Sequence, residues 1–201
     1  MESHLLKAFL IFFCLLGTCY GDVLFSSLSH TLVVTASPNQ GQVLNAGEDS
    51  ITVTWGLNQS FPTGTDELYK EVKVNLCYAP ISQVDRAWRK TVDNLGKDKT
   101  CQFTIVNKPY ERNQSIEWII NKDVPTATYF VRAYAYNSAG EEVAYDQTAD
   151  GKKSSNLFEI QAISGRHLSL DIASVCFSAF SLLSLFGFFL AEKSKRRQVK
   201  N

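Results

Sequence analysis

The feature that most constrains this chain is a long apolar segment close to its C-terminus. The twenty residues 172–191 carry no charge, and the basic sequence EKSKRRQVK follows directly. A helix of that length, rising about 1.5 Å per residue, matches the hydrocarbon thickness of a bilayer. Basic residues beside a span mark its cytoplasmic side, so we expect a transmembrane helix at 172–191 and a cytoplasmic tail at 192–201. A buried core helix and a GPI-anchor signal are the alternatives, but a GPI signal would end on the apolar run.

A second apolar run, residues 8–16, follows a single lysine near the N-terminus. Cys19 and Gly21 then place small residues at the −3 and −1 positions of a cleavage site, which predicts a secretory signal peptide over residues 1–21. A retained signal anchor is the alternative, but about nine apolar residues are too few to span a bilayer. We therefore expect a type I single-pass protein of the plasma membrane, reached by the secretory pathway, with its N-terminal domain outside the cell.

Two cysteines remain once these segments are set aside. Cys77 and Cys101 fall in the expected extracellular domain, residues 22–165, where oxidising conditions favour a disulfide between them. Closing a loop of this length is worth about 3 kcal/mol on the chain-entropy model. The same compartment makes Asn58 and Asn113 plausible glycosylation sites, because each begins an Asn-X-Ser sequon.

Between the two apolar segments, short apolar runs alternate with turn residues. In residues 50–57, for example, Ile51, Val53 and Trp55 alternate with Ser and Thr. A period of two is typical of strands with one buried face. Eight such runs occur, at 31–36, 50–57, 70–78, 101–106, 116–120, 128–136, 142–147 and 157–163. They predict an all-β fold, an antiparallel β-sandwich.

Two stretches refine this fold prediction. The sequence TYFVRAYAYNSAG (128–140) resembles the strand and turn near the end of fibronectin type III domains, with Tyr129 as the corner tyrosine. The sequence AGEDSITVTW (46–55) resembles the second strand of that immunoglobulin-like fold, with Trp55 in the core. We expect both aromatics to be packing residues. The two cysteines do not follow the immunoglobulin pattern, whose bridge joins opposite sheets across a longer separation.

The strand pattern stops between the cysteines, at an insertion spanning residues 78–100. The insertion has five basic and three acidic residues, whereas residues 22–165 as a whole have 13 basic and 17 acidic ones. Ser82 is expected to cap a short helix here. One interpretation is a solvated loop closed by the disulfide. The other is a docking surface, because Trp and Arg are enriched at interface hot spots and a rigid loop loses less entropy on binding.

The docking interpretation makes specific candidates of the charged and aromatic residues of the insertion. Arg89 and Asp98 would offer opposite charges for ion pairs with a partner. The candidate contact residues are Asp85, Arg86, Trp88, Arg89, Lys90 and Asp98.

Within the expected membrane helix, Ser174, Ser178 and Ser181 share one face. Small residues on one face let a second helix approach closely, so this face is a candidate for packing in the membrane. The alternative is that each serine only bonds back to the preceding helical turn.

The sequence offers no catalytic or metal-binding constellation. The three histidines, His4, His30 and His167, are far apart, and no Cys/His cluster has zinc spacing. We expect no enzyme and no cofactor. The acidic balance of the domain also argues against a nucleic-acid partner.

Several long segments are similar to one known family. They are KVNLCYAP (73–80), SQVDRAWRK (82–90), KDKTC (97–101), PTATYFVRAYA (125–135), EVAYDQT (142–148) and NLFEIQAISGRHLSLDIAS (156–174). With the span and basic tail they resemble the plant high-affinity nitrate transporter accessory (activating) proteins, over about residues 42–195. The leader and the first mature residues depart from the family, and family members often have proline at the position of Ala87.

This resemblance implies a non-enzymatic subunit that does not itself carry nitrate. Such a subunit binds a multi-pass high-affinity nitrate transporter of the major facilitator type in a hetero-oligomer. It is needed for the transporter's presence at the plasma membrane and for nitrate uptake. A single span without intramembrane charge cannot form an ion path, which agrees with that role. A generic cell-surface receptor or adhesion module is the alternative, although a tail of about ten residues is short for signalling.

Overall fold

The computed structural model describes residues 23–165 and 168–198. The predicted signal peptide, residues 1–21, lies outside the described residues, as do the last three residues of the predicted tail. The chain divides into two compact units, Met1–Ala162 and Ile163–Asn201. The first contains the β-domain and the second contains one long helix, and each is described by itself.

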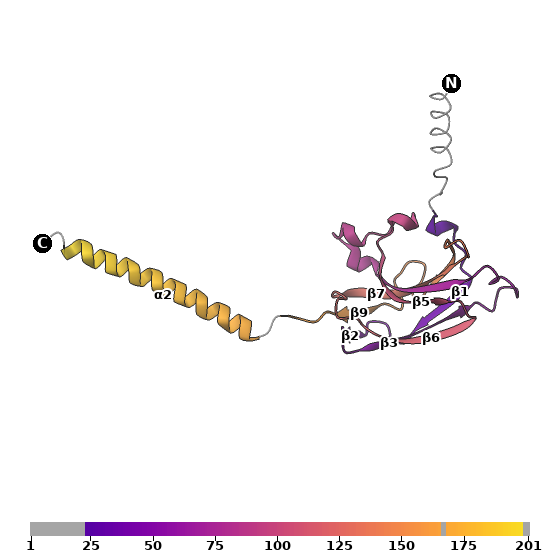
Figure 1. Ribbon diagram of the computed structural model, residues 1–201, viewed down its shortest axis with the longest axis horizontal. Coiled ribbons are helices and arrows are strands. Elements are labelled where there is room, and N and C mark those ends of the chain that lie inside the picture. The colour runs from indigo at the N-terminus through magenta and orange to yellow at the C-terminus, as the bar shows by residue number, and fades with distance from the viewer. Residues whose placement is uncertain (1–22, 166–167, 199–201) are drawn as a thin grey trace, which may run out of the picture. The chain divides into compact units, whose positions relative to one another are not determined.

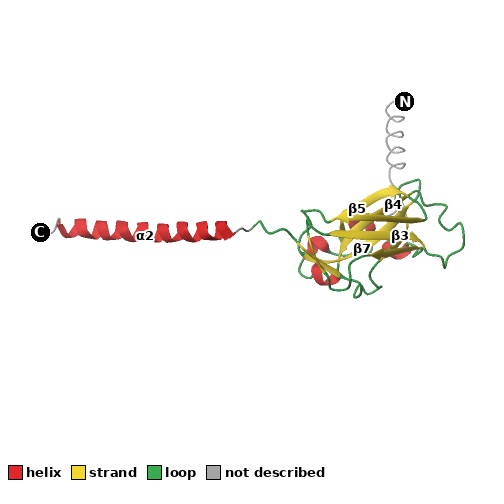
Figure 2. Cartoon of the chain, turned by 90° about the horizontal axis from the view of Figure 1, so that it is seen from below, coloured by secondary structure: helices red, strands yellow, loops and turns green. Residues whose placement is uncertain are grey.

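The β-domain is a sandwich of two sheets (Figures 1 and 2). Its strands are β1 (Leu32–Ala36), β2 (Val43–Asn45), β3 (Ser50–Leu57), β4 (Glu71–Tyr78), β5 (Cys101–Pro109), β6 (Asn113–Ile119), β7 (Ala127–Tyr136), β8 (Glu142–Gln147) and β9 (Phe158–Gln161). One sheet has the order β1-β3-β6. The other has the order β2-β9-β7-β4-β5, with β8 also paired to β7. The all-β prediction and all eight predicted strands are confirmed.

The prediction of an antiparallel sandwich is wrong for one pair of strands. The short strand β2, which the sequence pattern missed, pairs in parallel with β9. Three residues are too few to display an alternating pattern, so nothing in Val43–Asn45 indicates a strand before the fold brings it beside β9.

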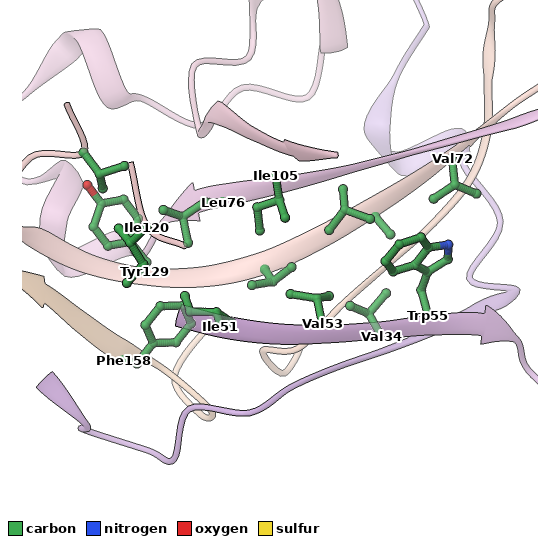
Figure 3. Packing of buried hydrophobic residues seen from close by; sticks show 14 of the residues in the cluster. Val34, Ile51, Val53, Trp55, Val72, Leu76, Ile105, Ile120, Tyr129 and Phe158 are labelled. Carbon is green, nitrogen blue, oxygen red and sulfur yellow. The ribbon is translucent and has the colours of Figure 1, made fainter. Parts of the chain in front are cut away.

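The core lies between the sheets and is built from the predicted alternation. Ile51, Val53 and Trp55 of β3 are at most 1 % exposed, and they face equally buried residues of β4 such as Val72 (Figure 3). Burying each large aliphatic side chain contributes about 1.5–3 kcal/mol. The role of Trp55 as a core tryptophan is therefore confirmed, and its indole N–H donates to Gln114 on β6.

Tyr129 on β7 has the predicted corner geometry. Its ring is buried, and its hydroxyl donates to the backbone oxygen of Pro125, four residues upstream, at 2.6 Å. Burial raises the pKa of Tyr129 far above its ordinary value, so the phenol stays protonated and remains a donor. The resemblance to fibronectin type III domains holds at this corner, while the closer assignment to that fold remains a prediction.

The sandwich has two ends that differ in what they carry. At one end, which we call the insertion end, Tyr78 pairs with Tyr129, and the chain continues directly into the insertion. The domain's last residue, Ala162, is at the same end, because its N–H donates to the Thr126 hydroxyl just before β7. The chain thus leaves the domain beside the insertion.

At the opposite, far end of the same strand pair, Glu71 pairs with Tyr136. The backbone N–H of Tyr110 donates to the oxygen of Lys70 here, so the β5–β6 turn belongs to the far end. Gly56, which pairs with Asn113 at the start of β6, lies here too, and the N–H of Leu57 donates to the oxygen of Arg112.

The second unit contains α2, Leu168–Gln198. In the described part of the chain it is the one helix that is long and apolar enough to cross a membrane, over Leu168–Arg196. The predicted span, residues 172–191, lies inside it. The hydroxyls of Ser174 and Ser178 donate to backbone oxygens three and four residues upstream, as serines in apolar helices commonly do. Packing of the face with Ser181 against another helix stays a prediction.

Candidate docking surface

The insertion folds as three short 3₁₀ turns between β4 and β5. They are η2 (Pro80–Gln83), η3 (Ala87–Arg89) and η4 (Leu95–Lys97). The expectation that Ser82 caps a helix is wrong, because Ser82 lies within η2 and is buried. Its hydroxyl instead accepts the N–H of Thr128 on β7 at 2.8 Å, so this residue attaches the insertion to the sheet.

The predicted disulfide is confirmed at the base of the insertion. Cys77 and Cys101 are bonded, with their Cα atoms 4.0 Å apart, and they are also direct partners in the β4–β5 ladder. The bond therefore closes the loop where the two strands already meet. This arrangement limits the freedom of the insertion without using any of its surface.

Arg89 and Asp98 are turned inward, contrary to the expectation that they pair with a partner. Arg89 is 7 % exposed, and its guanidinium lies 4.1 Å from the centre of the Tyr78 ring. The Asp98 side chain is 6 % exposed and accepts bonds from the N–H of Val92 and from the Thr100 hydroxyl. Both side chains therefore hold the insertion in shape, which removes them from the exposed contact set.

Asp98 also faces a buried arginine of the sheet, Arg132. Arg132 on β7 is 1 % exposed, and its Nη1 lies 3.8 Å from the Asp98 carboxylate. The guanidinium also donates to Gln147 on β8 and to the Tyr134 hydroxyl. The pKa of nearby Lys153 is lowered, because burial and then the charge of Arg132 disfavour its ammonium form.

This buried cluster means that the insertion covers the outer face of the larger sheet. The sequence contains one sign that this face of the sheet is covered, an arginine on a strand that also carries tyrosines. The sign is weak, because such residues are also common on a solvent-exposed face. Only the folded structure shows that the insertion lies against β7.

Other residues of the insertion point outward and form a mixed apolar and basic surface. Trp88 is 58 % exposed, Val84 is 63 % exposed and Ile81 is 69 % exposed. Asp85, Arg86 and Lys90 are exposed beside them and, with Val84, line a shallow pocket. We call Ile81, Val84, Asp85, Arg86, Trp88 and Lys90 the docking surface.

Four of the six predicted contact residues are exposed on this surface, and their contact with a partner stays a prediction, while Ile81 and Val84 are exposed residues that the sequence did not single out. Ile81 and Val84 lie in or beside a 3₁₀ turn, so no strand or helix period singled them out. Asp85 has a φ of 57°, a left-handed conformation that few residues other than glycine adopt.

The described residues contain no group of three or more His, Cys, Asp or Glu side chains placed to hold a metal ion. The exposed chemistry of the insertion is that of recognition: aromatic and aliphatic area beside two cations. Such a composition is typical of protein–protein hot spots.

Comparisons with known proteins show which family the chain resembles. Residues 25–165 match the NAR2 family model, described as high-affinity nitrate transporter accessory, Ig-like domain. High-affinity nitrate transporter 3.2 of Arabidopsis thaliana is 49 % identical over 98 % of each chain. High-affinity nitrate transporter 3.1 of the same plant is 54 % identical over 83 % of this chain and 80 % of its own.

A rice protein with a similar name is also similar in sequence. High-affinity nitrate transporter-activating protein 2.1 of Oryza sativa subsp. japonica is 47 % identical, over 87 % of this chain and 84 % of its own. Among solved structures, a Niemann-Pick type C2 protein from the Japanese carpenter ant covers 65 % of this chain and 89 % of its own. Its TM-score of 0.29 and identity of 10 % support no inference about fold or function.

Proposed function

The chain belongs to the family of high-affinity nitrate transporter accessory proteins, and we propose that it is a non-enzymatic subunit that binds a multi-pass nitrate transporter. The partner is a transporter of the major facilitator type, and the two form a hetero-oligomer at the plasma membrane. In this complex the transporter depends on the subunit for its presence at that membrane and for nitrate uptake.

The observation that carries the proposal is the docking surface. Three large apolar side chains, Ile81, Val84 and Trp88, are more than half exposed within one eight-residue stretch of the insertion. Large apolar side chains that are exposed close together in the sequence and bordered by charged residues are typical of interaction sites. The surface is also held in place before binding, by the disulfide and by Ser82, which reduces the entropy lost on association.

The fold supports a partner in the same membrane. The disulfide fits an oxidising compartment such as the cell exterior, and α2 fits a single-pass anchor. The chain leaves the domain at the insertion end, where Ala162 is bonded to Thr126 and Ser82 of the insertion to Thr128. We infer that the docking surface meets extracellular parts of the transporter, with Arg86 and Lys90 favouring an acidic segment there.

Co-expression tests this function. In cells without their own high-affinity nitrate uptake, we expect labelled nitrate uptake when the chain is expressed with a high-affinity nitrate transporter of the same species. Either protein alone should give background uptake, and surface biotinylation should find the transporter at the plasma membrane only in the pair. Equal uptake and surface abundance with the transporter alone would contradict the proposal.

We also propose that the far end carries N-linked glycans at Asn58 and Asn113. The two sequons lie close together, because Asn113 pairs with Gly56, two residues before Asn58. They are at the opposite end of the strands from the docking surface, so glycans there would leave that surface free. On a gel, glycosidase treatment lowers the apparent mass of a glycosylated chain. We expect Asn58→Gln and Asn113→Gln each to reduce this shift by the mass of one glycan, and we expect each variant to capture the transporter as well as the wild type does. A wild-type chain whose mobility glycosidase does not change would contradict this.

A further inference from the structure

The first described residues of the domain run alongside the insertion. Figure 1 shows this segment, which contains η1 (Phe25–Ser27), on the same side of the sandwich as the insertion. Leu24 forms an antiparallel bridge with Asn94. The N–H of Phe25 donates to the oxygen of Asp93 at 2.7 Å, and the N–H of Leu95 donates to the oxygen of Val23 at 3.0 Å. The segment therefore pairs with the insertion as a short two-stranded ribbon.

A carboxylate strengthens this pairing. Asp93 accepts the backbone N–H of Ser26 with one oxygen and the Ser26 hydroxyl with the other, both at 2.8 Å. Hydrogen bonds to an ionised group are about twice as strong as those between neutral groups. Both residues are exposed, so these bonds are accessible to mutation without disturbing the core.

The same segment closes the buried arginine cluster. The ring of Phe25 lies 4.4 Å from the Arg132 guanidinium carbon and 4.2 Å from the ring centre of Tyr145. Arg132 is in turn beside Asp98 of the insertion. Phe25 thus packs on the Arg132 guanidinium, which Asp98 of the insertion also contacts. This contact attaches the N-terminal segment to β7.

The other end of the segment is fixed to β8. Ser29 forms a parallel bridge with Ala144, and its oxygen accepts the N–H of Tyr145 at 2.9 Å. The His30 ring contacts the Tyr145 hydroxyl, and its Nδ1 lies 3.6 Å from Asp146. The segment is therefore bonded to the insertion near Leu24 and to β8 of the sandwich near Ser29.

We propose that residues 23–30 form a clasp that positions the docking surface. Phe25, Ser26 and Asp93 are its positioning residues, and they act through the insertion rather than by touching a partner. The N–H of Lys99 donates to the oxygen of Lys90, so the clasped turn is tied directly to a docking residue. The clasp itself follows from these contacts, whereas its part in binding rests on the proposed function.

The test compares Asp93→Ala and Phe25→Ala with Phe61→Ala in the full-length chain. Phe61 is partly exposed, at 38 %, and lines a pocket with Leu57 and Asn113 at the far end. Amide hydrogen exchange is measured on the purified chain in detergent, and capture of the co-expressed nitrate transporter is measured separately. We expect about tenfold faster exchange at the amides of residues 93–99 in both clasp variants, with the β4 and β7 amides unchanged.

Transporter capture should weaken about fivefold in the clasp variants, because a loosened insertion loses more entropy on binding. Phe61→Ala should change neither exchange in the insertion nor capture. Unchanged exchange in the insertion would overturn the clasp, whatever happens to binding. Faster exchange with undiminished capture would overturn its positioning role. Failure of the proposed function is separate, because it would appear as a wild-type chain that captures no transporter.

Discussion

Replacing Asp98 by asparagine is expected to lower the free energy of unfolding of the domain by about 2–4 kcal/mol. The substitution keeps the size of the side chain but removes the one carboxylate that lies close to the buried Arg132 in the described part of the chain. Arg132 and the partly buried Lys153, which act on each other electrostatically, then remain as two cations without this carboxylate. A buried charge left without its counter-charge is among the largest single-site losses in stability.

The matched control is Asp85→Asn, the same chemical change at an exposed position of the same insertion. Asparagine tolerates the left-handed backbone of Asp85, so stability should change by less than about 0.5 kcal/mol. Urea unfolding of the full chain in detergent, followed by circular dichroism, measures both. A double-mutant cycle with Arg132→Gln isolates the coupling. Equal stability of the two asparagine variants, or a cycle without coupling, would show that the Asp98–Arg132 contact contributes nothing.

Replacing Trp88 by alanine should leave the free energy of unfolding unchanged, in contrast to Asp98→Asn, but should weaken transporter binding. Trp88 is 58 % exposed and its ring makes no aromatic or cation contact within the described residues, so its removal disturbs little of the fold. At an interface hot spot, loss of a tryptophan costs about 2 kcal/mol or more, which weakens binding about 30-fold. Equilibrium capture of the transporter from solubilised membranes, with urea unfolding alongside, measures the two effects.

Leu68→Ala is the control for this prediction. Leu68 is 67 % exposed, as open as the docking residues, but it precedes Lys70 at the far end. Removing it tests whether any exposed apolar side chain would matter. We expect capture to be unchanged, because in the proposed function only the docking surface meets the transporter.

Much of the sandwich could be predicted because its signals are local. The alternation in β3 and β4 follows from the two-residue period of a strand and needs no knowledge of the partner strand. The corner bond of Tyr129 spans four residues. The disulfide followed from counting cysteines in an expected extracellular domain.

The insertion could be predicted to exist, but the direction of its side chains could not. Arg89 and Asp98 look like surface charges in the sequence. Arg89 points inward because it packs on the Tyr78 ring, and Asp98 points inward because it lies beside the Arg132 guanidinium. Neither partner is a near neighbour in the sequence. The clasp is likewise non-local, since Phe25 meets a residue more than a hundred positions away. Such contacts depend on the folded topology and leave no periodic trace.

The central claim is that the chain binds its transporter through the exposed side chains of the docking surface. The buried Arg89 and Asp98 only hold the insertion in shape. The most direct measurement is transporter capture by Trp88→Ala and Leu68→Ala, compared with the wild type at a temperature where all three chains are folded. We predict that Trp88→Ala loses about 30-fold in apparent affinity, while Leu68→Ala stays within about threefold of the wild type. Full capture by Trp88→Ala, or a loss at Leu68→Ala as large as at Trp88→Ala, would contradict the account.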